Sequence, residues 1–441
     1  MLFDWAQQPF HTLIITFVFA PYFAAAVAPD AARGQELWGY ATGIGGLMIA
    51  LSSPVLGAIA DASGPRKPWI FGFSTIGVLA CAALWFAVPG MTPLWPVLVV
   101  VALAFFGMEF AAVFNNAMMP TLVPRSELGR LSGSAWGLGY LGGLASLVLV
   151  LGFMSTTSGT SHTLLGVEPI FGLDPMQREG DRAAGPLTAL WYVVFVLPMF
   201  LLTPDQPRRS VAGAVRQGLR QLGRTLYRLP SERSYFSFLA SSMFYRDALN
   251  ALYTFGGIYA AGVLNWSITQ IGLFGILANI TGALGAWAGG RMDQAFGPKA
   301  VVTTSILTLS FCCLLVISTT RSDVLFLPVG GATALPDVVF FLAGALIGAA
   351  GGAVQAASRT LLVDQAPRAQ VTEAFGLYAL SGKATTFIGP FSVAAATAYF
   401  SSEALALAPE TAQRLGVTPI LVLFLLGLIL LPLVRSRQPA G

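Results

Sequence analysis

The sequence predicts an all-α membrane protein with twelve transmembrane helices in two pseudo-symmetric six-helix bundles. Hydrophobic residues make up 55% of the 441 residues and charged residues only 10%, whereas soluble domains carry about 25% charged residues. Apolar runs of membrane-spanning length recur along the whole chain, and one charged loop pattern occurs in both halves. Lipid must therefore cover much of the protein surface.

Each predicted span is a run of about 20 mainly apolar residues, the length that crosses a bilayer as a helix. The twelve runs lie at about 9–28, 37–60, 68–88, 95–118, 132–154, 186–203, 236–261, 269–289, 300–318, 337–357, 372–398 and 418–434. The first six predict an N-terminal bundle within residues 1–203, and the last six a C-terminal bundle within 236–441. Residues 204–235 form the basic linker between them. Because Met1–Gln8 holds no Lys or Arg, the first run is expected to be a retained helix.

Lys and Arg residues concentrate in alternate loops, which predicts the orientation because inner loops carry the excess of these residues. The inner set is Arg66, Lys67, Arg125, Arg130, Arg208, Arg209, Arg216, Arg220, Arg224, Arg228, Arg233, Arg291, Lys299, Arg359, Arg368, Arg435 and Arg437. The outer set is Arg33, Arg178, Arg182, Arg321 and Arg414. We therefore expect a multi-pass protein of the cytoplasmic (inner) membrane with both termini in the cytoplasm.

The linker has two interpretations. Its arginines recur every four residues and its leucines lie near another helical face, which is typical of a basic amphipathic helix on the inner membrane surface. A solvated linker is the alternative. The residues concerned are Arg216, Arg220, Arg224, Leu219, Leu222 and Leu226. The longest outer loop, Ser155–Gly185, is rich in Gly, Ser and Thr and indicates no role.

Two loops in matching positions of the two halves share one pattern. The first reads GAIADASGPRKPW after the second run, and the second reads GGRMDQAFGPKAV after the eighth. The pattern residues are Gly57, Asp61, Gly64, Arg66 and Lys67 in the first loop and Asp293 and Lys299 in the second. Glycine permits a tight turn, and the carboxylates are placed to meet helix N-termini or cations. We expect these loops to hold the inner helix ends together in one state and to release them in another, as duplicated halves would.

The first loop resembles the signature loop of the major facilitator superfamily, Gly-x-x-x-Asp-x-x-Gly-x-Arg-Lys. The second departs from it by one extra residue and by having only Lys299 as its cation. Further segments resemble the vacuole-effluxer-like branch, related to the fungal autophagy-associated amino-acid effluxer. They are residues 3–23, 113–124, 129–143, 244–260 and 352–390. The resemblance implies a transporter, not an enzyme, with amino acids as the suggested cargo and helices 1, 4, 7 and 10 lining the path.

Charged residues within apolar runs are the candidates for substrate and ion binding, because inserting each one costs at least about 2.5–3.5 kcal/mol. Arg246 and Asp247 lie near the middle of the seventh run, and Asn250 shares a helical face with Asp247. We expect this face to bind a polar substrate, with Asp247 as the proton or cation site. The alternative is a structural Arg–Asp pair that never meets the cargo.

Five residues in other runs complete the candidate set. Lys383, near the middle of the eleventh run, is expected to bind a carboxylate or to neutralise Asp247, with a structural ion pair as the alternative. Glu109 and Asn116 share a face of the fourth run, where Glu109 is either the coupling carboxylate or a partner of a neighbouring helix. His11 can titrate near neutral pH, but its shallow depth favours an interfacial hydrogen bond. Gln355 lies near the end of the tenth run.

Several motifs are set aside. Gly137, Gly139 and Gly142 spell GxGxxG inside an apolar run, so close helix packing is expected instead of a dinucleotide site. The sequence lacks a phosphate-binding GxxxxGK[ST] loop and has only two histidines, so neither ATP-driven transport, a cofactor nor a metal site is expected.

These features together predict secondary active transport of a small polar solute by alternating access about a site near the midplane. The expected cargo is an amino acid or a related metabolite, with protons or Na+ as the coupling ion. Two alternatives remain, a sugar or glycoside symporter and a non-transporting membrane receptor or scaffold. The expected partners are the lipid bilayer and a small-molecule substrate, since a net charge of +4 does not indicate nucleic acid.

Overall fold

The computed structural model describes two compact units. Unit 1 comprises Met1–Leu122 and Leu138–Gln221, and unit 2 comprises Val123–Gly137 and Leu222–Gly441. The described residues are 1–29, 31–156, 161–207, 213–264, 266, 268–329, 333–400, 402, 407 and 409–436. Arg208, Arg209 and Arg437 of the predicted inner set lie outside them. The bundle boundaries given above stay a prediction.

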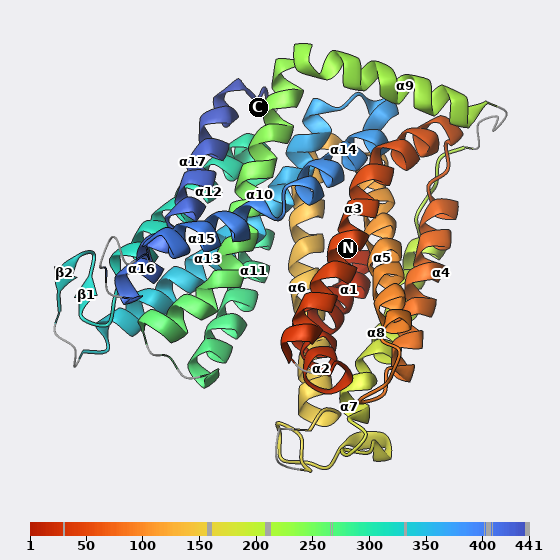
Figure 1. Cartoon of the computed structure of the whole chain (residues 1–441). Coiled ribbons are helices and arrows are strands. Elements are labelled where there is room, and N and C mark those ends of the chain that lie inside the picture. Colours follow the sequence, from red (N-terminus) through yellow and green to blue (C-terminus); the bar gives the residue numbers. More distant parts are fainter. Residues whose placement is uncertain are drawn as a thin grey trace. The chain divides into compact units, whose positions relative to one another are not determined.

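Unit 1 is built from helices joined by short loops. Its elements are α1 (Leu2–Pro9), η1 (Phe10–Phe17), α2 (Phe19–Tyr22), η2 (Phe23–Val27), α3 (Ala31–Ser63), α4 (Lys67–Ala83), η3 (Leu84–Phe86), α5 (Trp95–Leu122), η5 (Ile170–Gly172), α7 (Glu179–Arg182), α8 (Ala184–Leu202) and parts of α6 (Leu128–Phe153) and α9 (Ala214–Arg228). Helix α4 packs against both α5 and α8, and α3 packs against α5 (Figure 1). Stacked phenylalanines on α4 and α5 fill the space between those two helices.

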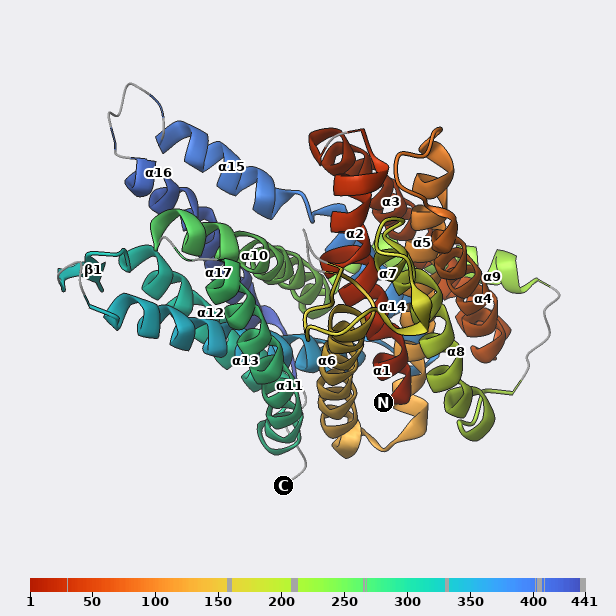
Figure 2. The same cartoon turned by 90° about the horizontal axis from the view of Figure 1, so that it is seen from below.

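Unit 2 is also helical, apart from one short hairpin. Its elements are η4 (Arg125–Glu127), η6 (Leu229–Ser231), α10 (Arg233–Val263), α11 (Ile268–Phe296), α12 (Pro298–Ser318), β1 (Asp323–Val324), β2 (Leu327–Pro328), α13 (Leu335–Gln365), η7 (Arg368–Gln370), α14 (Val371–Ala384), α15 (Ile388–Phe400), α16 (Pro409–Gly416), α17 (Thr418–Leu430) and η9 (Leu431–Leu433). Helix α13 lies between α11 and α12, and α10 packs against α17 (Figure 2). The strands pair antiparallel, Asp323 with Pro328 and Val324 with Leu327.

Ten helical segments among the described residues are long and apolar enough to cross a bilayer. The two predicted spans that do not meet this criterion are the seventh, which is α10, and the eleventh. Helix α10 contains Arg246 and Asp247. The eleventh span is not one helix as predicted but two, α14 and α15, separated by Thr385–Phe387. Pro390 explains part of this break, because its ring nitrogen cannot donate to the carbonyl four residues earlier.

The first span also departs from a regular α-helix. It contains two π-helical stretches, η1 and η2, separated by a break at Val18. Pro9 cannot donate to the Trp5 carbonyl, and the Trp191 indole of α8 donates to that oxygen at 3.0 Å instead. The two indoles stack with their centroids 5.5 Å apart. This pair fixes α1 against α8.

Glycines of the GxGxxG segment let neighbouring helices approach α6 closely, as the sequence predicts. A Cβ at Gly137 would lie 2.9 Å from the Ala283 carbonyl oxygen of α11 in unit 2. In unit 1, a Cβ at Gly142 would lie 2.9 Å from the Trp5 carbonyl oxygen of α1. These distances are shorter than ordinary contacts, so the segment serves helix packing.

The long outer loop, whose role the sequence does not indicate, is held to unit 1 by a charged cluster. Asp181 is buried and accepts hydrogen bonds from Ser155 and Arg178. Arg182 donates to the Trp85 carbonyl at 2.9 Å and lies over the Trp85 ring. The described part of the loop is therefore attached to the ends of α4 and α6.

Gly142→Ala is expected to lower the thermal unfolding midpoint in detergent, because overpacking a close contact costs about 1–3 kcal/mol. Gly139→Ala is the matched control, since its Cβ would lie 3.5 Å from Asp4, an ordinary contact. Equal midpoints for the two variants in a fluorescence-detected melt would contradict the packing role of Gly142.

Candidate functional site

The unit 1 part of the candidate site joins the first span to α5. His11 lies at the start of η1, and its Nε2 is 3.8 Å from Glu109 Oε1 on α5. Both side chains are partly exposed. Gln7, one turn earlier, donates to the Met108 carbonyl at 3.0 Å and fixes the spacing of the two helices. The arrangement forms an ion pair whenever His11 is protonated.

The π-helical turn explains how His11 is presented. π-helical turns are rare and are frequent at functional sites. The Thr16 hydroxyl donates to the His11 carbonyl at 2.9 Å, a backbone oxygen that this wider turn leaves accessible. Asn116 lies two turns beyond Glu109 on α5 and is half-buried. The sequence predicts His11, Glu109 and Asn116 as separate candidates but does not predict the π-helix.

In unit 2, Arg246 of α10 is held against α14. Its Nη1 donates to the Tyr378 carbonyl at 2.8 Å, and its guanidinium carbon lies 4.1 Å from the centre of the Tyr378 ring. Gly382 makes room for this, because a Cβ there would overlap the guanidinium group. The hydrogen bond and ring contact of Arg246 thus run to the neighbouring helix, and the pairing of Arg246 with Asp247 stays a prediction.

Asp247 occupies the interface between α10 and the break in the eleventh span. Its side chain is 1% exposed, and its Oδ1 has no hydrogen-bond partner among the described residues. The Thr385 hydroxyl and the Arg246 guanidinium are the polar groups that act on this carboxylate. A Cβ at Gly389, at the start of α15, would lie 2.8 Å from the Asp247 carbonyl oxygen. The carboxylate therefore faces the point where α14 ends and α15 begins.

The other unit 2 candidates lie on α10, α13 and α14. Lys383 is half-buried in the last turn of α14, where a cation is favoured by the helix dipole. Asn250 is exposed, although the sequence places it on one face with the buried Asp247. Gln355 of α13 is half-buried, and its neighbour Ser358 is hydrogen-bonded to Tyr245 at 2.7 Å.

The first charged loop is held by charged contacts within unit 1. Arg66 Nη2 donates to Asp61 Oδ1 at 2.8 Å, and both side chains are buried. Gly64 has a φ of 100°, a left-handed conformation that suits glycine. The Asp205 carboxylate accepts from the backbone N–H groups of Arg66 and Lys67 at 2.9 and 3.0 Å. Asp205 therefore caps α4, a role with no sequence signal because it lies far along the chain.

The second loop repeats the geometry with different partners. Gly297 also has a positive φ, of 82°. Lys299 Nζ donates to the Val434 carbonyl at 2.7 Å, as Lys67 Nζ donates to the Phe200 carbonyl at 2.8 Å. Both lysines thus bind a carbonyl near the end of the last predicted span of their half.

Asp293 of the second loop has different neighbours from Asp61. The buried Asp293 accepts from the Thr360 hydroxyl of α13. A Cβ at Gly129, in the first turn of α6, would lie 2.8 Å from Asp293 Oδ2. The carboxylate therefore lies beside a helix N-terminus, where negative charge is favoured.

Arg359 of α13 binds the same end of α6, within unit 2. It is 4% exposed, and its Nε donates to Ser132 Oγ at 3.0 Å while its Nη2 donates to the Ser132 carbonyl at 2.8 Å. The guanidinium carbon lies 5.3 Å from the Trp136 ring centre, and Arg125 pairs with Asp364 nearby. Charged contacts thus join the start of α6 to α11 and α13.

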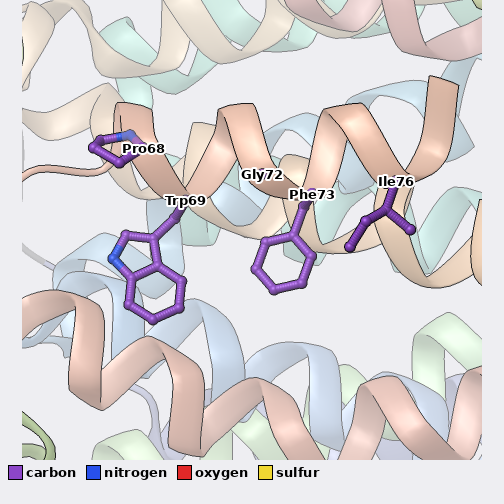
Figure 3. Close-up of a pocket in the computed structure, with 5 residues that line it drawn as sticks. All are labelled: Pro68, Trp69, Gly72, Phe73 and Ile76. Carbon is purple, nitrogen blue, oxygen red and sulfur yellow. The ribbon is translucent and has the colours of Figure 1, made fainter. Parts of the chain in front are cut away.

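An apolar groove of about 320 Å³ runs along one side of α4 (Figure 3). Its lining residues are Pro68, Trp69, Gly72, Phe73 and Ile76. None is charged, and none is a predicted substrate-site residue. The groove therefore differs in chemistry from the charged positions described above.

These apolar helices, the repeated charged loops and the charges within spans define a membrane transporter of the major facilitator type. A solved structure of the proton:xylose symporter XylE bound to 6-bromo-6-deoxy-D-glucose superposes with a TM-score of 0.71, covering 99% of this chain and 95% of that chain at 12% identity. Because the sequence identity is this low, the comparison shows the fold alone. The superposition confirms the predicted twelve-helix, two-bundle fold.

The family follows from sequence comparison. The model of the family described as "Vacuole effluxer Atg22 like" matches residues 37–439, so the chain belongs to this family. The uncharacterised MFS-type transporter YxiO of Bacillus subtilis is 24% identical over 99% of this chain and 94% of its own length. Autophagy-related protein 22 of Coccidioides immitis is 22% identical over 80% of this chain and 65% of its own length. The predicted resemblance is confirmed.

Arg359→Ala is expected to speed amide hydrogen exchange in residues 125–137 by about 10–100-fold, because hydrogen bonds to charged groups contribute about 1.5–3 kcal/mol each. Exchange mass spectrometry of the full chain measures this effect. Arg368→Ala, at an exposed position, is the control and should leave the same peptide unchanged. Unaltered exchange in the Arg359 variant would contradict a role for this residue in holding the start of α6.

Proposed function

We propose that this protein is a proton-coupled secondary transporter of small amphoteric solutes such as amino acids, working by alternating access. One observation carries the proposal. A buried carboxylate within a span, Asp247, has an oxygen without a hydrogen-bond partner among the described residues and faces the break between α14 and α15.

The environment of Asp247 supports a titrating role. A carboxylate buried without full hydrogen bonding is costly in its charged form, so binding a proton relieves that cost. Charged side chains inside spans commonly mark ion and substrate pathways. Asp247 lies opposite the ends of two half-helices, the arrangement in which discontinuous membrane helices bind substrates and coupling ions. Proton binding at Asp247 would therefore depend on whether a solute occupies the break between α14 and α15.

The cations around the break support a substrate with a carboxylate group. Arg246 and Lys383 bring two cationic side chains to this part of unit 2, which also contains the carboxylate of Asp247. Cationic groups of this kind suit an anionic group on the solute. Asp247 provides a place for an ammonium group or for the coupling proton. Unit 1 adds Glu109 and His11 as a second proton-exchanging pair.

The contacts at the start of α6 support a gate. Asp293, Arg359 and Asp364 hold residues 125–137 to α11 and α13. Release of these contacts would free the inner helix ends that the repeated loops are predicted to hold together. Charged and hydrogen-bonded contacts suit this purpose because they form and break without leaving large apolar surfaces exposed.

Asp247→Asn is expected to abolish uphill, proton-driven transport while solute exchange across the membrane continues, since asparagine keeps the shape but holds no titrating proton. Proteoliposomes with an imposed pH gradient measure the first activity, and counterflow of a labelled solute measures the second. A loss of at least tenfold in accumulation is expected. Asp337→Asn, which breaks an ion pair with Arg321, is the control and should keep coupling. Undiminished accumulation in the Asp247 variant would refute the proton role.

Lys383→Gln is expected to raise the half-saturating concentration of a carboxylated solute by about tenfold, because the variant loses one charge-assisted hydrogen bond of about 1.5 kcal/mol. The matching amine without its carboxylate should be unaffected. Thermal stabilisation of the purified protein across amino acids, their decarboxylated amines and sugars measures both. Stabilisation by sugars and not by amino acids would favour a sugar transporter and end the cargo proposal.

A further inference from the structure

Helix α9, in the predicted linker, has an unusual charge composition. Its sequence AVRQGLRQLGRTLYR contains four arginines and no acidic residue. The arginines are Arg216, Arg220, Arg224 and Arg228, and all four are exposed. Among the described residues none of them takes part in an ion pair. The helix therefore presents uncompensated positive charge along its length.

The apolar side chains of α9 form a separate row. With about 100° between successive residues, Val215, Leu219, Leu222 and Leu226 fall within a sector of about 60°. The arginines fill the adjoining sector, beginning with Arg216 beside the apolar row. Leu222 is buried, whereas Val215 is 54% exposed and Leu219 and Leu226 are each 46% exposed. The apolar row is thus only partly covered by protein.

Contacts in unit 1 place the beginning of α9 at the end of a span. A Cβ at Gly218 would lie 2.8 Å from the Ala58 carbonyl oxygen, near the end of α3. Figure 1 shows the unit 1 part of α9, Ala214–Gln221, running across the direction of α4. Because α9 connects the sixth predicted span, α8, to the seventh, α10, both of its ends are expected at the same membrane surface. We therefore expect the helix at headgroup level.

We propose that α9 binds the headgroups of anionic phospholipids, with its exposed apolar row in the interface and its arginines on lipid phosphates. Guanidinium groups bind phosphate oxygens bidentately. An apolar row beside a cationic one is the pattern of interfacial helices. An acidic soluble protein or a nucleic acid would engage the arginines but would leave Val215, Leu219 and Leu226 in water. The side that carries most Lys and Arg is also the predicted inner side, whose leaflet holds the anionic lipids.

A label on α9 tests this proposal in the full chain. Gly223 is suitable because a Cβ there meets no atom within 4 Å and lies between the apolar and cationic sectors. Cys81, Cys312 and Cys313 are buried, so a Gly223→Cys variant takes an environment-sensitive fluorophore at one reactive position. The protein is placed in nanodiscs of phosphatidylcholine alone or with about 30% phosphatidylglycerol. Emission wavelength and quenching by acrylamide are then measured.

The expected result is blue-shifted emission and protection from acrylamide in discs containing phosphatidylglycerol. In the double variant Arg216→Gln/Arg220→Gln, the ratio of protected to unprotected label should fall about fivefold for each arginine. High salt should produce a similar loss. Arg216→Lys/Arg220→Lys keeps the charge and should retain most of the protection. Arg130→Gln/Arg368→Gln, at two exposed positions elsewhere, should have no effect.

Three outcomes would overturn the proposal. The first is protection that does not depend on phosphatidylglycerol. The second is an equal loss in the Arg130/Arg368 control. The third is the same protection produced by soluble glycerol phosphate with phosphatidylcholine discs, which would identify a soluble phosphate ligand. Thermal melts of each variant check that the spans are folded, so a loss of protection without a change in the melt reports on α9 alone.

Discussion

The requirement that backbone polar groups inside a membrane be satisfied within the protein governs this structure. Regular helices satisfy this requirement with their own backbone hydrogen bonds. The informative positions are therefore those where a backbone carbonyl loses its helical donor or accepts a hydrogen bond from another helix. The Trp5 carbonyl, freed by Pro9, accepts from the Trp191 indole. The Tyr378 carbonyl accepts from Arg246, nearly two turns before α14 ends. In both cases the donor comes from another helix, so each irregularity fixes the position of two spans.

The second of these contacts also determines the chemistry of unit 2. By binding the Tyr378 carbonyl and ring, Arg246 is drawn toward α14. The side chain of the next residue, Asp247, points about 100° away around α10 and is buried beside the break. A single backbone requirement thus orients a cation and an anion that are adjacent in sequence toward different environments.

The sequence predicts the features that depend on local composition. It does not predict the contacts between residues that are far apart in the chain. The spans follow from apolar runs, and the tight packing of Gly142 follows from its place in an apolar helix. The loop containing Asp61 and Arg66 follows because both partners lie within a few residues. The break after Ala384 is less predictable, since a proline such as Pro390 does not always end a membrane helix, as Pro198 within the unbroken α8 shows. Asp205 gives no signal, because its partners are more than 130 residues away.

The two charged loops look alike in sequence, but their contacts differ in a way that bears on gating. Asp61 is paired with Arg66 of its own loop, an interaction that need not change when the two halves move. Asp293 lies instead against Gly129 at the start of α6, a helix from the other half of the sequence. The Asp293 contact therefore joins helices from the two halves of the sequence. We propose that the second loop, despite its poorer match to the signature, opens and closes during transport. A match to a signature measures local turn geometry, and gating depends on which half supplies the partner.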